Sequence, residues 1–469
     1  MTTHTAHPQL KPAPAEPIDR LARVEEGDGN RSAARQDFRA THHSDATRQI
    51  LDTDESIFIH QSLSTPCLNV LSGCDGSYLI DAEGRKILDF HGNGVHAIGF
   101  AHPRVVAAVT RQLTELPFCT RRYTNQPAIK LAQTISSNLP DVDQSGGHGW
   151  RVLFTPAGSL AVGTAMKIAR YVTGRYKAVG MWGSFHGSSL DTISIGGERM
   201  FRDRMGPLLP GTLHVHPWNP DRTVADALGE MERLFRAEGD IGAVVAEPIR
   251  WSTITIPPRE YWQGVRELCD KHGALLIFDE IGTCMGRTGK WFGFEHYLTD
   301  SEAGKPTKPA MPDIVVMGKA TGGGVLPLAA VAIQKHLVPP DATGDVALGH
   351  YTHEKSPLCC AAGQAAMDVI RDERLLMRAA DFGAKTLQRM KDTFLPLPGV
   401  KAVRGLGMMF AVELESEDHA ERTMYRCLRA GLSYKVSSGR VLTLVSPINI
   451  AEADMDFAID TLRQTISAG

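Results

Sequence analysis

The sequence lacks any stretch of about twenty uncharged apolar residues, the length that an α-helix needs to cross a bilayer. Its first residues also lack the charged start and the following apolar segment that mark an export signal. These two absences predict a protein that is neither exported nor anchored in a membrane.

A strong excess of charge of one sign is also missing. The 469 residues carry 50 Lys and Arg against 53 Asp and Glu, a net charge of −3, and no basic cluster interrupts this balance. A near-neutral chain offers no electrostatic reason to expect nucleic acid or a membrane as partner. The expected partner is a small-molecule substrate.

The cysteines show no regular spacing along the chain. There are eight cysteines, and several of them, such as Cys269, lie inside apolar segments. No short paired spacing suggests a disulfide framework or a metal site. The sequence therefore predicts no metal, and the reducing cytoplasm is the expected location.

Apolar residues are plentiful, and their pattern predicts an α/β protein. They make up 42% of the chain, enough for a core divided between two domains. Between about residues 131 and 333, short apolar runs alternate with helical patterns, which favours a mostly parallel sheet covered on both faces. The expected strands are 152–154, 178–182, 243–246, 275–278 and 314–317.

The regions on either side of this alternation have patterns of their own. Residues 1 to about 50 show no apolar period and predict a mobile or draped tail. From residue 67, the strings CDGS and DAEGR predict turns between antiparallel strands that end near residue 90. After residue 357, helical patterns dominate until the segment 403–414, which alternates like a strand after a glycine turn.

Two charged residues follow apolar strands and suggest a chemistry. Lys319 follows the run 314–317 in PDIVVMGKATGGG, and Asp279 follows the run 274–278 in ALLIFDEIGTCMGRTG. Open α/β sheets bind ligands at the carboxyl ends of their strands. A lysine there could bond to an aldehyde cofactor and later act as a base, while the aspartate keeps a pyridine nitrogen protonated. Taken separately, each residue is more often a surface charge or a cap.

The long string around these two residues resembles the class III aminotransferase family, whose pattern runs roughly DEV, GRTG, PDI and GK with glycines. Other strings resemble further family landmarks in the same order: FTPAGSLAVGTAMKIAR, WGSFHGSSL, VVAEPI and GHYTHEKSPLCCAAGQAAMDVI. The resemblance covers roughly residues 60 to 469. It implies pyridoxal 5'-phosphate as cofactor and the fold type I of pyridoxal-phosphate enzymes: a large domain with a mostly parallel sheet of the seven-stranded type, and a smaller α+β domain.

This fold implies a division of the chain. We expect an N-terminal tail at 1–50, an N-terminal segment of the small domain at 51–110, the large cofactor-binding domain at 111–354, and the C-terminal small domain at 355–469.

The resemblance also assigns cofactor contacts. Gly158 and Ser159 lie between a strand and a helix, where free amide groups and the helix dipole suit a phosphate dianion, although ordinary turns use the same residues. By resemblance, Phe185 stacks on the cofactor ring, Ile281 presses its opposite face and Glu247 lies nearby. An aromatic after a strand is otherwise more often plain core.

A further resemblance concerns assembly. Thr352, in GHYTHE, matches a threonine that family members contribute from the neighbouring subunit. The resemblance therefore implies a homodimer with shared active sites.

Departures from the family pattern concern the substrate. Family members carry an arginine near the C-terminus that grips a carboxylate, and the string GRVLTLVSPINI places Thr443 there, with Arg440 offset by three residues. A hydroxyl cannot replace a planar, doubly donating cation. The adjacent Arg121 and Arg122 would suit a phosphonate or phosphate instead, unless they are a solvated surface pair. Gly282 stands where a glutamine is frequent, and Cys284 replaces a glycine.

Within the family, DFHGNGVHAIGFAHPRV, LPFCTRRYTNQPAI and GHYTHEKSP resemble the ammonia-lyases of (1R)-1-hydroxy-2-aminoethylphosphonate. The expected reaction yields phosphonoacetaldehyde and ammonia, with Lys319 and Asp279 as catalytic residues. The alternatives are an aminotransferase acting on an amine or ω-amino acid and a phospho-lyase acting on an amino-alcohol phosphate. A non-catalytic regulator is disfavoured, because the first fifty residues show no amphipathic helix pair of the helix-turn-helix kind.

Overall fold

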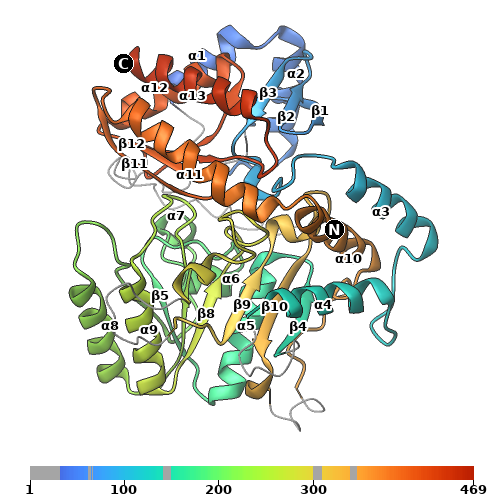
Figure 1. The fold of residues 1–469 in the computed structure, drawn as a ribbon, viewed down its shortest axis with the longest axis vertical. Coiled ribbons are helices and arrows are strands. Elements are labelled where there is room, and N and C mark those ends of the chain that lie inside the picture. Colours follow the sequence, from blue (N-terminus) through green and yellow to red (C-terminus); the bar gives the residue numbers. More distant parts are fainter. Residues whose placement is uncertain (1–31, 62–64, 66, 141–148, 299–308, 339–345) are drawn as a thin grey trace, which may run out of the picture.

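A seven-stranded sheet forms the centre of the larger part of the molecule (Figure 1). The computed structural model describes residues 32–61, 65, 67–140, 149–298, 309–338 and 346–469. The strand order is β4-β10-β9-β8-β7-β5-β6, and β10 runs antiparallel to both of its neighbours. The strands are β4 (Trp150–Thr155), β5 (Lys177–Met181), β6 (Thr212–Val215), β7 (Ile241–Ala246), β8 (Leu275–Asp279), β9 (Ile314–Met317) and β10 (Ala329–Gln334). The expected mostly parallel sheet is confirmed.

Helices cover both faces of this sheet, so its strands are apolar on both sides. In β8, Leu276 and Phe278 belong to the apolar cluster that includes Trp262, whereas Leu275 and Ile277 belong to the cluster built on α5. The helices of this part are α4 (Gln126–Asn138), α5 (Gly158–Thr173), α6 (Leu190–Ile195), α7 (Arg199–Arg202), α8 (Val224–Glu238) and α9 (Arg259–His272).

The smaller part contains two four-stranded sheets in the upper half of Figure 1, where β1, β2 and β3 are blue and β11 and β12 are orange. One has the order β1-β2-β3-β13, and the other has the order β11-β12-β15-β14. The strands are β1 (Leu71–Asp75), β2 (Tyr78–Asp81), β3 (Lys86–Asp89), β11 (Val400–Leu406), β12 (Met409–Leu414), β13 (Leu432–Ser433), β14 (Lys435–Ser437) and β15 (Val441–Val445). The antiparallel strands predicted before residue 90 are confirmed.

Segments from both ends of the chain build this smaller part together. The parallel pairing of β3 with β13 joins the two segments. Its C-terminal helices are α12 (Glu417–Arg429) and α13 (Glu452–Ser467), and the connecting helices are α3 (Pro103–Glu115), α10 (Pro357–Asp372) and α11 (Leu375–Phe394). The boundary expected at residue 110 falls inside α3. We retain the division at 50, 110 and 354 as a proposal.

The N-terminal segment differs from the expected tail. Residues 1–31 lie outside the described residues, but α1 (Ala33–His42) and α2 (Asp45–Ile57) follow them. Ser32 and Ser44 cap these helices by accepting hydrogen bonds from the backbone amides of Arg35 and Thr47. The described residues of the expected tail are therefore helical from Ala33 onward, and nothing in the geometry of these described residues assigns them to the helix-turn-helix kind.

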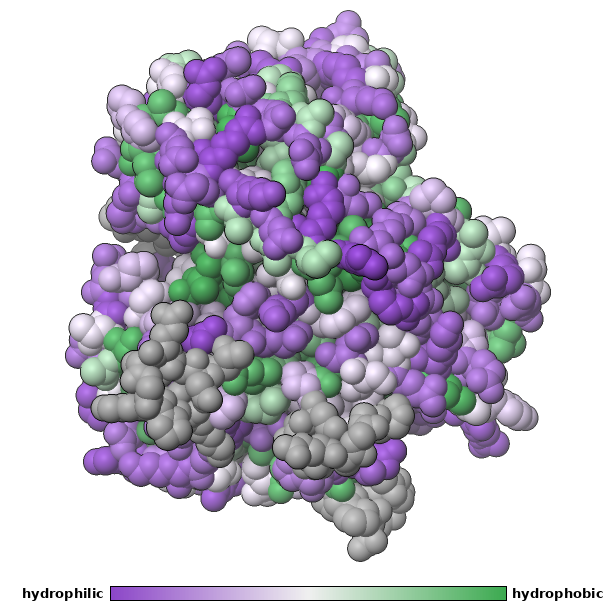
Figure 2. Space-filling model, viewed as in Figure 1, coloured by the Kyte–Doolittle hydropathy of each residue, from purple (hydrophilic) through white to green (hydrophobic). Residues whose placement is uncertain are grey.

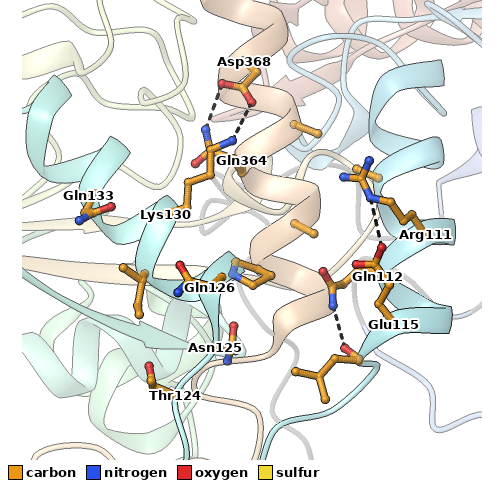
Figure 3. Close-up of a pocket in the computed structure, with 16 residues that line it drawn as sticks. Arg111, Gln112, Glu115, Thr124, Asn125, Gln126, Lys130, Gln133, Gln364 and Asp368 are labelled. Atoms are coloured by element: carbon orange, nitrogen blue, oxygen red, sulfur yellow. Dashed lines mark hydrogen bonds and ion pairs between the residues drawn. The ribbon is translucent and has the colours of Figure 1, made fainter.

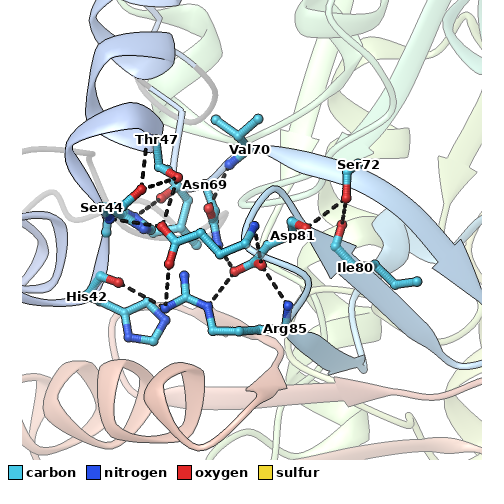
Figure 4. Close-up of polar contacts among 12 residues, drawn as sticks. His42, Ser44, Thr47, Asn69, Val70, Ser72, Ile80, Asp81 and Arg85 are labelled. Carbon is cyan, nitrogen blue, oxygen red and sulfur yellow. Dashed lines mark hydrogen bonds and ion pairs between the residues drawn. The ribbon is translucent and has the colours of Figure 1, made fainter.

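The two helices are held by the rest of the chain. Phe38 of α1 is 2% exposed, and its ring centroid lies 5.5 Å from that of Tyr425 in α12. At the start of α2, the Thr47 hydroxyl donates to Glu83, and Arg85 next to it donates to Asp81 at 2.7 Å (Figure 4). These contacts, together with the buried side chains of Phe38 and Leu51, hold both helices against their own chain.

Hydrophilic residues prevail over the face shown in Figure 2, with hydrophobic residues scattered among them. Within the described residues, no helix combines the length and the apolar character that crossing a bilayer requires.

Candidate active site

Three ionisable side chains meet at the carboxyl edge of the central sheet. Glu247 follows β7, Asp279 ends β8, and Lys319 follows β9 after one glycine. These strands are adjacent and parallel, so their ends lie side by side. The structure thus brings together the lysine and the two carboxylates that the sequence singled out.

Asp279 is held in a fixed position and is nearly buried. It is 4% exposed, and its Oδ1 accepts a hydrogen bond from the backbone amide of Ile281 at 3.0 Å. Its Oδ2 lies 2.7 Å from Nδ1 of His186, whose side chain is fully buried. One carboxylate oxygen is therefore held by backbone and the other by an imidazole.

His186 is a site residue that the sequence analysis missed. Burial lowers the pKa of this imidazole, but the hydrogen bond and the charge of Asp279 outweigh burial, so the net shift of the pKa is upward. Its other ring nitrogen, Nε2, is buried and has no hydrogen-bond partner among the described residues. The string SFHG contained this signal, since the histidine directly follows Phe185.

Lys319 adopts an unusual backbone conformation at the start of a short 3-10 helix, η3 (Lys319–Gly322). Its φ of 48° lies in the left-handed region, which costs a non-glycine residue about 1–3 kcal/mol and is concentrated at functional sites. The Nζ atom lies 4.6 Å from the ring centroid of Trp251, within the range of a cation–π contact. Trp251 thus forms one wall beside the amine.

Two glycines make room for the Trp251 ring. A Cβ added at Gly282 would lie 2.5 Å from Trp251 Cε3, and one added at Gly94 would lie 2.7 Å from Cζ2. Arg287, whose guanidinium carbon lies 5.8 Å from the same ring, donates hydrogen bonds to Ser446 O and Gly94 O. The glycine at position 282, which departs from the family pattern, therefore leaves the space that the Trp251 ring occupies.

The N-terminus of α5 lies close to the same strand ends. This helix begins at Gly158 and Ser159, and in the part of the chain that the structure describes no side chain caps it. A Cβ added at Gly158 would lie 2.9 Å from Ile281 Cδ1, and one added at Gly318 would lie 3.2 Å from Ile281 Cγ1. Ile281 is thus packed between the first residue of α5 and the glycine before Lys319.

A cavity of about 290 Å³ opens beside Lys319. It is lined by His91, Asn93, Phe185, Glu247, Trp251, Ser252, Lys319 and Lys435. Burial raises the pKa of the Glu247 carboxyl, while the charge of His186 opposes this rise. Lys435, on β14 of the smaller part, is a second cation in this cavity, and the sequence analysis did not identify it.

The other expected residues lie elsewhere. Arg121 and Arg122 are exposed in the turn before α4, and Thr352 is exposed after the segment 339–345; none of the three lines the cavity. Thr443 is 2% exposed, and its hydroxyl donates to Ser252 O at 2.6 Å. Arg440 is directed to Glu413, with 3.7 Å between Nε and Oε1.

A larger cavity of about 750 Å³ lies between α3, α4 and α10 (Figure 3). Its charged groups neutralise one another: Arg111 faces Glu115 at 4.0 Å, and Lys130 faces Asp368 at 3.9 Å. It contains none of the strand-end residues. Its size alone therefore gives it no chemistry.

The strand-end site fits pyridoxal phosphate. Lys319 could bind its aldehyde, the Asp279 carboxylate its ring nitrogen, and the uncapped N-terminus of α5 its phosphate. The glycines at 158 and 318 support this fit, because side chains there would collide with Ile281. In the described part of the chain, no group of three or more His, Cys, Asp or Glu is placed to hold a metal ion.

Comparisons with known proteins show the family of the chain. The family model for class III aminotransferases matches residues 60–466. The chain is 38% identical to the (R)-1-hydroxy-2-aminoethylphosphonate ammonia-lyase of Vibrio splendidus, over 94% of this chain and 95% of that protein. It is 32% identical to the acetylornithine aminotransferase of Methanopyrus kandleri, over 84% and 93%. An aminotransferase structure from Bacillus anthracis superposes with a TM-score of 0.81 at 27% identity, covering 91% of this chain and 100% of that one.

Proposed function

Because the chain belongs to the class III aminotransferase family, whose enzymes use pyridoxal 5'-phosphate, we propose that it is an ammonia-lyase for an amino-phosphonate. The proposed substrate is (1R)-1-hydroxy-2-aminoethylphosphonate, and the products are phosphonoacetaldehyde and ammonia. The relative from Vibrio splendidus, which carries this activity in its name, supports the proposal.

The observation that carries the proposal is the side chain at position 443. A transaminase must bind a keto acid as second substrate, and in this family an arginine grips its carboxylate. Thr443 has no cation, and its hydroxyl is engaged with Ser252 O. Arg440, three residues away, is directed to Glu413. The loss of this clamp favours a reaction that consumes no amino acceptor.

The strand-end residues would divide the work as follows. Lys319 holds the cofactor and serves as the base, and Asp279 keeps the ring nitrogen protonated, oriented by His186. Gly158 and Ser159 bind the phosphate through their amides, and Phe185 and Ile281 enclose the ring. Glu247 orients neighbouring groups from the next strand.

The proposed reaction needs one base and one leaving group. Pyridoxal phosphate, when bound, withdraws electrons from the carbon that carries the substrate nitrogen. Lys319 Nζ removes a proton from that carbon and returns it to the β-hydroxyl, which leaves as water. The resulting enamine is released, tautomerises and takes up water, which yields phosphonoacetaldehyde and ammonia. The water lost in the elimination is balanced by the water taken up in the hydrolysis.

Assembly as a homodimer with shared active sites is part of the proposal. Thr352 would then act in the site of the neighbouring subunit, and Arg121 and Arg122 would meet substrate there. Large exposed apolar side chains near this pair support such a surface: Leu113 is 55% exposed and Phe118 is 39% exposed. A cytoplasmic location is supported by the eight cysteines, which are all free.

A second candidate function is transamination of an amine or ω-amino acid. The acetylornithine aminotransferase of Methanopyrus kandleri supports it as a family activity. Both reactions share the proton abstraction by Lys319. They differ afterwards, since transamination requires reprotonation at the cofactor and a keto acid.

One incubation separates these candidates. The purified holoenzyme is given the hydroxy-aminophosphonate without any keto acid, and ammonia and phosphonoacetaldehyde are measured. We expect both products in equal amounts. Alanine formed without free ammonia when pyruvate is added would establish transamination, and inorganic phosphate released from an amino-alcohol phosphate, supplied in a second incubation, would indicate a phospho-lyase.

A further inference from the structure

A second buried cation lines the cavity beside Lys319. Lys435 begins β14 and is 8% exposed. It shares the cavity of about 290 Å³ with Lys319, Phe185 and Glu247, although it belongs to the smaller part of the molecule. The cavity therefore has one lysine from each part of the chain.

The position of Lys435 explains why the arginine can be absent. In the antiparallel pair of β14 and β15, Lys435 lies directly opposite Thr443. Side chains of such opposed residues lie on the same face of the sheet, about 4.5–5.5 Å apart at Cβ. The face that carries an arginine in other family members therefore carries a lysine here, one strand away.

The other cations near the C-terminal sheet are placed differently. Arg440 is 45% exposed at its side chain and faces Glu413, which also pairs with Arg404 and Lys401. Arg121 and Arg122 are exposed and do not line the cavity in this chain. Since Lys319 is assigned to the cofactor, Lys435 is the remaining lysine or arginine among the described residues that line the cavity.

We propose that Lys435 binds the anionic end of the substrate, and that this anion is a tetrahedral phosphonate or phosphate in preference to a carboxylate. An ammonium is a compact point charge with three donors, whereas the planar guanidinium matches a carboxylate with two parallel hydrogen bonds. Replacing an arginine fork by a lysine thus favours the tetrahedral anion. The inference rests on the proposed function only in requiring a substrate with both an amine and an anion.

Ligands that lack the β-hydroxyl test this site without elimination, and the absence of a keto acid prevents repeated turnover. The matched pair is 2-aminoethylphosphonate and 3-aminopropanoate, which differ only in the anion, and n-propylamine, which has no anionic group, is the reference. Affinities of the holoenzyme are measured by calorimetry and by the change in cofactor absorbance. For the wild-type protein we expect the phosphonate to bind more tightly than the carboxylate.

The variants are Lys435→Met and Lys435→Arg, with Lys401→Met as matched control. Lys401 lies on the same sheet but is 48% exposed and pairs with Glu413 at 3.1 Å. Lys435→Met should weaken 2-aminoethylphosphonate by at least about ten-fold, because one partner of a buried charged contact is removed. Its affinity for n-propylamine and for the cofactor should not change, and Lys435→Arg should shift the preference toward the carboxylate.

Several outcomes would overturn the inference. Equal weakening of all three ligands would show a structural role for Lys435, and unchanged affinities would show no contact with the anion. Weakening by Arg121→Ala but not by Lys435→Met would move the anion site to the exposed pair. These results are independent of the proposed lyase activity, which fails separately if no ammonia forms without a keto acid.

Discussion

Because Trp251 packs against Gly282, we expect the effect of Gly282→Ala on the free energy of unfolding to change sign when Trp251 is replaced by alanine. A Cβ added at Gly282 would lie 2.5, 2.9 and 3.2 Å from three atoms of the Trp251 ring. Carbon atoms in contact normally lie about 3.5–4.0 Å apart, so the ring would have to move by about 1 Å. The second glycine, Gly94, contacts the far edge of the same ring, and Trp251 is only 8% exposed. The Trp251 ring therefore has little room to move away from position 282.

From this geometry we expect Gly282→Ala to lower the free energy of unfolding by about 1–3 kcal/mol, the usual range for overpacking. In a protein that also carries Trp251→Ala, the ring that the added Cβ would meet is absent. The same substitution should then be neutral or stabilise by up to about 1 kcal/mol, because alanine restricts the unfolded chain more than glycine does. The two positions are thus coupled.

Urea unfolding of the apoprotein, followed by far-ultraviolet circular dichroism, measures the four proteins of this cycle. Gly229→Ala in α8 is the matched control, since its added Cβ meets only Arg233 Nη1 at 3.4 Å. The control should be stabilised by about 0.5–1 kcal/mol. An equal penalty for Gly282→Ala with and without Trp251 would refute the assigned contact.

Two further predictions concern the strand ends. Lys319→Ala should lower turnover by at least about 100-fold and abolish the adduct that borohydride traps on this residue; an undiminished rate would refute its role as base. In the apoprotein, the net pKa shift of His186 is upward, so its contribution to stability is fully present below its ordinary value of 6.5 and disappears as the pH rises through the raised value. The stability advantage of the wild-type apoprotein over His186→Asn, measured by urea unfolding, should therefore shrink with rising pH, and a difference that grows with pH would contradict the ion pair.

The strand-end half of the site was predictable because its signals are local. Asp279 and Lys319 each follow an apolar run within a few residues, and parallel strands place such ends together. The direction of β10 was not predictable in this way, because an apolar run such as Ala329–Gln334 has no orientation of its own. The N-terminal helices were missed although their signals were local: capping serines precede them, and Phe38 and Leu51 supply their buried faces.

The other half of the site depends on contacts between distant segments. Trp251 and Gly282 belong to loops after different strands, and neither residue alone predicts the other. Lys435 and Thr443 meet only through the register of β14 on β15. A lysine within a short strand otherwise indicates a solvated edge, so the sequence pattern favoured Arg121 and Arg122 instead.

The side chains at positions 435 and 443 depend on each other, because only one of the two positions can carry the cation that binds the anion. An arginine at 443 would face Lys435 directly across the strand pair, and like charges in opposed positions destabilise a sheet. The Thr443 hydroxyl also lies 3.1 Å from Ser437 Oγ and donates to Ser252 O, so a guanidinium there would displace two buried polar contacts. A single Thr443→Arg change would therefore not create a carboxylate clamp in this cavity. The cation would have to be removed from β14 at the same time, whereas Asp279, Glu247 and Lys319, on the opposite part of the molecule, could remain as they are.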